Sequence, residues 1–307
     1  MTPDASPIGQ LDLFLHGRAE LFANEVCNAL LARDALHASE ALRQLQNDAP
    51  AHPHIQALRT LCAALPPTPR PAPDTRTVAD RVRWLKTQVE TAARMTLGSS
   101  APLFMQPIWR ELAEAVQDEP YQASTAGTFC AELYLRGDDP RSAQRAALGI
   151  ANRALEPAAL HWLAVAGFRS EGLRAARPPL FRLAWLAPQR VPITLDAIAA
   201  SPFPTDWNEF WTVCDWLDPH REGGAWFPAW SLYQYPATRI PLKSLEPLPE
   251  SIPARAFIAL QHLLSLEPRG HSAALITARA VLRELAPEFF ALYMAKRRSM
   301  DHHKTAP

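Results

Sequence analysis

Apolar residues recur at helical spacing through most of this sequence, and the alternating runs of β-branched residues that mark strands are absent. Val78, Val82, Leu85 and Val89, for example, are four or three residues apart and so share one face of a helix. The chain has 30 prolines but only 11 glycines. This balance favours short helices that proline starts or ends, with Pro107 at one such start, over tight β-turns. The sequence therefore predicts an all-α fold.

A pattern of one small residue, two leucines and one proline occurs twice, with the same spacings of four, three and five residues. The two copies are Ala38, Leu42, Leu45 and Pro50, and Ala176, Leu180, Leu183 and Pro188. Two weaker copies, in which the proline comes later, are Ala143, Ala147, Ile150 and Pro157, and Ala274, Ala278, Val281 and Pro287. The small residue lets a neighbouring helix approach, and the larger residues fill the groove beside it.

Each copy follows a polar turn and an earlier amphipathic segment, which indicates about four helix–turn–helix units. The turns lie at residues 32–34, 136–139, 169–172 and 267–270. In this arrangement the chain resembles the tetratricopeptide (TPR) repeat proteins over about a third of its length. The family's first-helix Trp, Leu-Gly and Tyr positions hold Phe22, Glu25-Val26 and Ala29 here, so the resemblance is to the architecture and not to a subfamily. The alternative is that an α-rich chain yields such spacings by chance.

The resemblance implies an α-solenoid-like array of helical hairpins, and such arrays present an extended concave surface to a protein or peptide. Two proline-rich stretches interrupt the array because their prolines cannot continue a helix. We expect an N-terminal helical repeat piece at 1–64, a proline-rich linker at 65–76, a central helical array at 77–236, a proline-rich loop at 237–253 and a C-terminal helical pair with a basic tail at 254–307.

Five of the nine tryptophans lie in residues 206–236, which we call the aromatic segment. Asp206 and Glu209 resemble a capping box at the start of a helix. Trp207 and Trp211 then fall on the apolar face of that helix. Since a large ring buries roughly 150–250 Å², we expect these two tryptophans in the core.

Other rings of the aromatic segment are candidates for binding. Trp216 lies off the apolar face, and Trp226 and Trp230 follow Gly223-Gly224, which we interpret as a hinge. Aromatic residues dominate binding surfaces because they provide a large contact area with few rotatable bonds. The predicted binding residues are Trp216, Trp226, Trp230 and Tyr233. The alternative is that the whole segment is core.

The best candidates for acid–base catalysis are Asp215, Asp218 and His220, because neighbouring tryptophans could desolvate them and shift their pKa values. The alternative is a helix end at Asp218-Pro219 with ordinary surface charges. Motifs for phosphate, dinucleotide, zinc-protease or hydrolase chemistry are absent from the sequence. The pair His52 and His54 lacks the further ligands of a metal site. We expect no metal and no cofactor, and a non-enzymatic protein is favoured.

The charges place further limits on function. Lys+Arg and Asp+Glu both number 31, so no overall field attracts nucleic acid or an anionic membrane. We find no signal peptide and no membrane span in the sequence. Four widely spaced cysteines fit reduced thiols in a cytoplasm, and the composition rich in Ala, Leu, Arg and Pro favours a bacterial one.

The sequence therefore predicts a non-catalytic scaffold or adaptor that binds a protein or peptide. The alternative is an enzyme or small-molecule-binding protein with its site around residues 206–235. Convergence of Asp215, Asp218 and His220 in a closed pocket would favour the enzyme. Their dispersal over an open surface would favour the scaffold.

Overall fold

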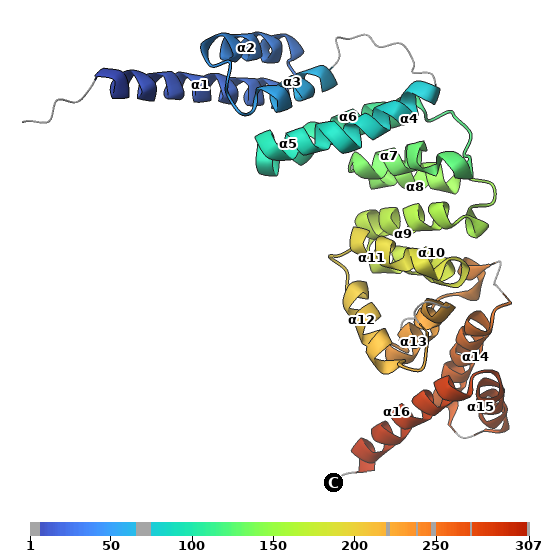
Figure 1. Cartoon of the computed structure of the whole chain (residues 1–307). Helices are drawn as coiled ribbons and strands as arrows, with labels where there is room; N and C mark the ends of the chain where they lie inside the picture. The colour runs from blue at the N-terminus through green and yellow to red at the C-terminus, as the bar shows by residue number, and fades with distance from the viewer. Residues whose placement is uncertain are drawn as a thin grey trace, which may run out of the picture. The chain divides into compact units, whose positions relative to one another are not determined.

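The computed structural model describes residues 7–65, 75–218, 222–237, 239–246, 250–270 and 272–305. Over these ranges the chain is helical and contains no strand, which confirms the all-α prediction (Figure 1). None of the helices in this part of the chain combines the length and the apolar composition that a membrane span requires. The chain divides into two compact units, Met1–Asp139 (unit 1) and Pro140–Pro307 (unit 2). This division falls inside the central array expected at 77–236.

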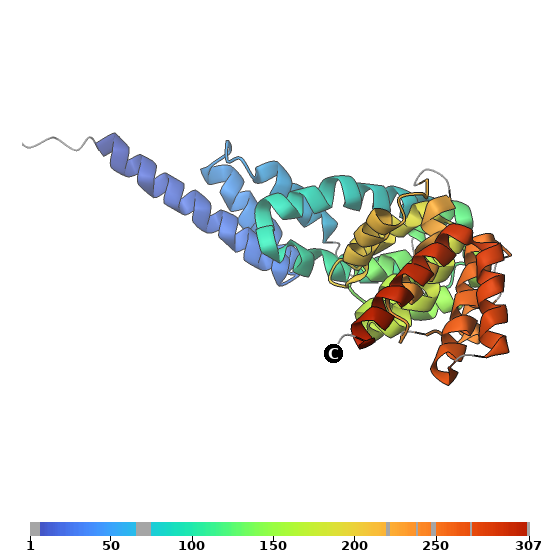
Figure 2. The same ribbon diagram turned by 90° about the horizontal axis from the view of Figure 1, so that it is seen from below.

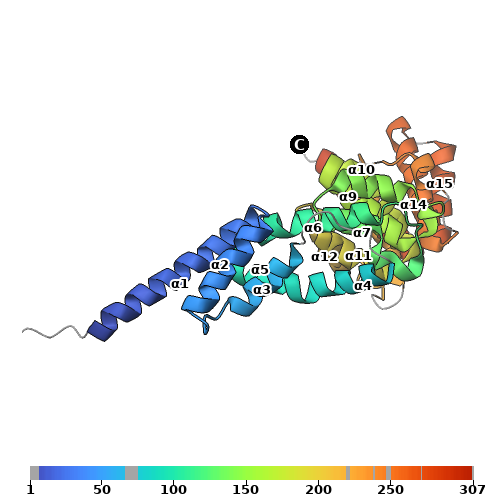
Figure 3. The ribbon, with the colours of Figure 1, turned by 90° about the horizontal axis from the view of Figure 1, so that it is seen from above.

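Unit 1 is built of helices that pack on their neighbours in the sequence. They are α1 (Pro7–Leu31), α2 (Ala35–Asp48), α3 (Ile55–Ala64), α4 (Thr75–Trp84), the π-helical turn η1 (Leu85–Val89), α5 (Glu90–Leu97), α6 (Ala101–Ala115) and α7 (Cys130–Arg136). α1 and α2 lie side by side (Figure 3), and α5 packs on both α3 and α6. Val78, Val82, Leu85 and Val89 are all buried, as their spacing predicts.

Unit 2 has the same neighbour-to-neighbour packing, with α10 at its centre. Its helices are α8 (Pro140–Leu148), α9 (Pro157–Glu171), α10 (Leu173–Leu186), α11 (Val191–Ala197), α12 (Phe203–Val213), α13 (Phe227–Gln234), α14 (Ile252–Leu266), α15 (Ala273–Leu285) and α16 (Pro287–Thr305). α10 contacts α9, α11 and α13. α14 and α15 lie side by side in the view of Figure 2 and in Figure 1.

The two regular copies of the repeated pattern are buried as predicted. Their alanines and leucines are Ala38, Leu42, Leu45, Ala176, Leu180 and Leu183, and all six are in the core. The weaker copy in α15 departs from the prediction, because Ala274 and Val281 are exposed there. Each predicted turn holds one residue with positive φ, namely Arg33, Asp138, Gly172 and Gly270. A residue in this conformation ends a helix and reverses the chain.

Proline starts helices in this chain, but it also lies inside them. Pro157 and Pro253 occupy the first turns of α9 and α14. Pro107, however, is inside α6, and Pro178 and Pro179 are inside α10. Proline has no N–H to donate to the carbonyl four residues earlier. The two prolines of α10 therefore leave two carbonyls in its first turns without helical donors.

The helices α9 and α10 approach each other at backbone distance. A Cβ atom added to Gly167 of α9 would lie 3.2 Å from the carbonyl carbon and oxygen of Ala175 in α10. The turn between the two helices is Gly172, whose φ of +85° strains any residue with a side chain. Glycine at both positions thus closes this hairpin tightly.

The two proline-rich stretches differ in what the structure describes. Most of the first linker, residues 66–74, lies outside the described residues. In the second stretch, 237–253, Ile240 and Leu245 are buried and a short 3₁₀ turn, η7 (Leu242–Leu245), packs on α10. Gln261 of α14 donates a hydrogen bond of 2.9 Å to the carbonyl of Ile240. This stretch is therefore an integral part of the packing of unit 2.

Candidate functional site

Several rings of the aromatic segment form part of the core of unit 2. Phe210 of α12 and Phe227 and Trp230 of α13 pack ring against ring, with centroids 5.8–6.0 Å apart. Trp207 joins them at 5.2 Å from Phe227. Edge-to-face and offset contacts at such distances are the favoured geometries of aromatic pairs. Trp207 and Trp211 are half-buried at the margin of this cluster.

Gly223 and Gly224 are buried beneath this cluster, so the hinge interpretation is wrong. A Cβ atom on Gly223 would lie 2.5 Å from the carbonyl oxygen of Asp218, and one on Gly224 would lie 2.9 Å from the Trp207 indole. The glycines are present because indole rings lie where side chains would otherwise be. The two glycines therefore allow close packing and do not provide a flexible hinge.

Trp230, predicted to be a binding residue, has 0% of its surface exposed. The prediction that it reaches the surface is wrong, because α13 turns this face into the aromatic core. Trp226 and Tyr233 are half-buried against α16, with centroids 5.7 and 6.2 Å from the Phe289 ring. Lys296 of α16 lies over the Tyr233 ring, at 4.5 Å from its centroid. Trp226 and Tyr233 thus pack against α16 of the same chain.

Among the four predicted binding residues, Trp216 is the most exposed, at 40%. It lies in the turn after α12. Asp215 and Asp218 are exposed, and His220 lies outside the described residues. The two aspartates are therefore on the surface and not inside a closed pocket.

Asp206 has a different role from the cap that the sequence predicts. α12 begins at Phe203, so Asp206 lies inside the helix and is buried. Tyr235 donates a hydrogen bond of 2.8 Å to its carboxylate. Burial raises the pKa of Asp206, while the bond from Tyr235 and the charge of Arg177 lower it in part. The same hydrogen bond raises the pKa of Tyr235 to about 12.

An open pocket of about 460 Å³ lies elsewhere in unit 2, and we call it the basic pocket. Its walls come from α8, α9, α10, the 3₁₀ turn η4 (Arg153–Leu155) and η7. The lining residues include Arg153, Arg182, Lys243, Leu163, Pro178 and Pro179. Segments that are distant in the sequence therefore form one site, which no local motif reveals.

Arg182 is the most buried charged residue that lines the basic pocket, with 8% of its surface exposed. One terminal nitrogen donates a hydrogen bond of 2.8 Å to the carbonyl of Ala154, and the other donates to the carbonyl of Glu246. Burial lowers the pKa of Arg182, and the charge of Arg153 lowers it further. Arg182 stands between apolar residues in the sequence, and that contrast is the signal that could have singled it out.

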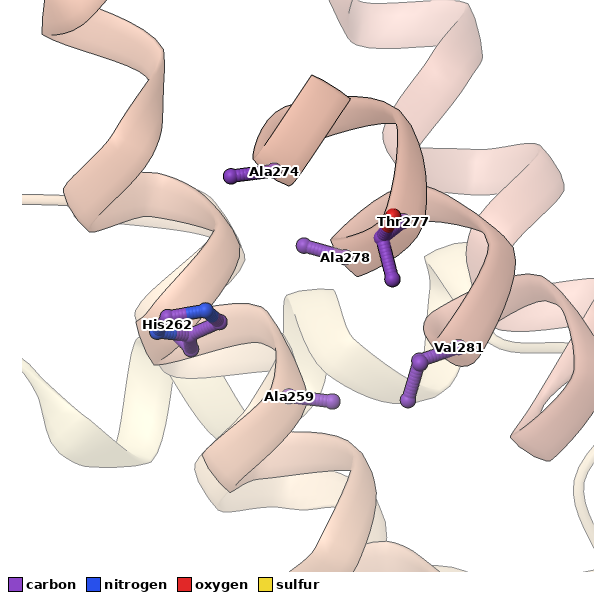
Figure 4. A pocket seen from close by; sticks show the side chains of 6 residues that line it. All are labelled: Ala259, His262, Ala274, Thr277, Ala278 and Val281. Carbon is purple, nitrogen blue, oxygen red and sulfur yellow. The ribbon is translucent and has the colours of Figure 1, made fainter. Parts of the chain in front are cut away.

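A second, apolar hollow of about 310 Å³ lies between α14 and α15, and we call it the α14–α15 groove. Figure 4 shows Ala259 of α14 and Ala278 and Val281 of α15 facing the space between the helices. His262 and Thr277 contribute its polar atoms. Small side chains on both helices leave this seam unfilled.

No group of three or more His, Cys, Asp or Glu side chains suited to a metal ion occurs among the described residues. The rings of His52 and His54 meet edge to face with 5.6 Å between their centroids, and Nε2 of His52 lies 3.6 Å from Oε1 of Glu20. These contacts tie the α2–α3 turn to α1.

Comparison of the chain with protein-family models, with curated proteins and with solved structures finds no match.

Proposed function

We propose that this protein is a non-catalytic helical-repeat scaffold that binds a protein partner, with an α-solenoid-like stacking of hairpins inside each unit. Packing between helices that are neighbours in the sequence, as in α8, α9 and α10, supports the repeat. The buried alanines Ala38 and Ala176 support it too. We also propose a reducing, cytoplasmic location, which the free thiols of Cys130 and Cys214 support.

The observation that carries the proposal is the α14–α15 groove. Its floor is alanine, and Val281 at its edge is 49% exposed. A groove between two helices accepts the apolar face of a third helix, whose side chains enter at helical spacing. We therefore propose that the occupant is an amphipathic helix of a partner protein. Because rings of the aromatic segment contact one another, we propose the binding surface at the α14–α15 groove and not at 206–235.

The test is affinity capture from the source cells with the wild type and with Val281→Asp, followed by titration of the purified partner. A charge in the apolar groove should weaken binding by about 2 kcal/mol, the size of a hot-spot loss. Ile193→Asp is the control, because Ile193 is also apolar and exposed, at 65%, but lies in α11.

Equal binding by wild type and Val281→Asp would refute the groove as the docking site. The other possible occupant of the groove is a second copy of the chain. Analytical ultracentrifugation of the purified protein tests this by measuring whether it forms a dimer. If the wild type is a dimer and Val281→Asp is a monomer, the groove binds a second copy of the chain and not a partner protein.

A further inference from the structure

We propose that the basic pocket of unit 2 binds a small organic anion whose acidic group meets Arg182, Arg153 and Lys243 and whose apolar body rests on α9 and α10. This site is separate from the α14–α15 groove. The proposal therefore goes beyond the scaffold function and does not depend on it.

The first step of the argument is the charge of Arg182. This guanidinium is almost completely buried, yet it forms no ion pair with a carboxylate in the described part of the chain. Its two hydrogen bonds go to neutral carbonyls, and a guanidinium has further N–H groups to donate. A buried charge is costly unless an opposite charge accompanies it. An anion in the adjoining pocket supplies that charge.

The second step is the rim of the same pocket. Arg153 and Lys243 are exposed there, and neither is paired with a carboxylate in the described residues. Ser244 adds a hydroxyl group. One carboxylate, that of Glu246, also lines the pocket, so three cations face one acid. The positive excess favours entry of an anion from solvent.

The third step is the apolar wall. Leu160 and Leu163 of α9 and the rings of Pro178 and Pro179 of α10 form the apolar part of the pocket lining. The volume of about 460 Å³ lies within the range of roughly 300–1,000 Å³ for small-molecule pockets. A bare inorganic ion would leave this wall uncovered. The fitting ligand is therefore a carboxylate or phosphate monoester with a short hydrocarbon body.

The experiment is calorimetric titration of the full chain with octanoate, octyl phosphate and the uncharged octanol. We expect at least one of the two anions to bind with a stoichiometry of one. Comparing the affinities of octanoate and octyl phosphate shows whether the pocket prefers a carboxylate or a phosphate. The variant Arg153→Ala/Lys243→Ala should weaken that binding about tenfold or more, since two charge-assisted contacts are lost. The control, Arg190→Ala/Arg283→Ala, removes the same charge from exposed positions outside the pocket and should leave binding unchanged.

Arg182 itself ties η4 and η7 to α10, so its replacement tests the fold as well as the site. The exposed pair is used because its loss leaves those two bonds intact. Three results would overturn the proposal: no anion binds at millimolar concentration, octanol binds as tightly as the anions, or the double variant binds like the wild type. Partner capture through the α14–α15 groove is measured separately, so either proposal can fail alone.

Discussion

Unit 2 contains two regions that use their side chains in opposite ways. In the aromatic segment, large rings such as Phe227 and Trp230 fill the space between α12 and α13. In the basic pocket, short side chains and prolines leave space between α8, α9 and α10, and cations line it. The segment most conspicuous in the sequence is closed, whereas the open site comes from inconspicuous residues.

This contrast has a simple physical origin. Aromatic side chains gain most free energy when they are buried against one another, so a cluster of them tends to become core. A pocket needs the reverse, namely walls that side chains do not fill and polar groups that remain partly unsatisfied. Three substitutions test how closely the aromatic segment is packed.

The largest effect is expected for Trp230→Ala. Removing this fully buried ring from the aromatic cluster should lower the free energy of unfolding by about 3–5 kcal/mol. Denaturant melts followed by circular dichroism measure the change. Trp216→Ala is the matched control, and because Trp216 is exposed it should cost within about 0.5 kcal/mol. A loss for Trp230→Ala as small as the one expected for the control would contradict its place in the core.

A smaller effect is expected for Gly223→Ala. The added methyl group would lie 2.5 Å from the carbonyl oxygen of Asp218 and 3.0 Å from the Trp211 indole, so the backbone must shift. Overpacking of this kind costs about 1–3 kcal/mol. In Gly127→Ala the methyl group meets nothing within 4 Å, and we expect little change. A flexible hinge at Gly223 would instead tolerate alanine as well as Gly127 does.

The smallest effect is expected for Asp206→Asn and depends on pH. Burial raises the pKa of Asp206, so the folded state binds its proton more tightly than the unfolded state does. The wild type therefore loses stability as pH rises from the ordinary carboxyl range through the raised pKa. Asparagine still accepts the hydrogen bond of Tyr235 but carries no charge. The stability of Asp206→Asn relative to wild type should increase from pH 4 to pH 7 in urea melts, and an opposite trend would contradict the assignment.

The sequence was sufficient for those parts of the fold that depend on local spacing. The stripe from Val78 to Val89 and the repeated alanines and leucines are buried as predicted, because helical periodicity determines which face turns inward. The four polar turns were predicted from their composition, and each contains a residue with positive φ.

The parts that the sequence did not reveal depend on contacts between distant segments. Trp230 is off the stripe of α12, but α13 packs it against Phe210. Pro178 and Pro179 remain inside α10, since the packing of that helix outweighs the two lost hydrogen bonds. The basic pocket joins Arg153, Arg182 and Lys243 from three separate segments. Single-sequence patterns do not contain such a juxtaposition.

The contact between α13 and α16 has a consequence for the order in which unit 2 is completed during synthesis. The ammonium group of Lys296 donates to the last carbonyls of α13, those of Tyr233 and Gln234, at 3.1 and 3.2 Å. A cation at this end of a helix also offsets the helix dipole. On the ribosome α13 emerges before α16, so during translation its carboxyl end has neither this cation nor the Phe289 ring over Trp226. The contacts that α16 makes with α13 and Trp226 can therefore form only after α16 has been synthesised.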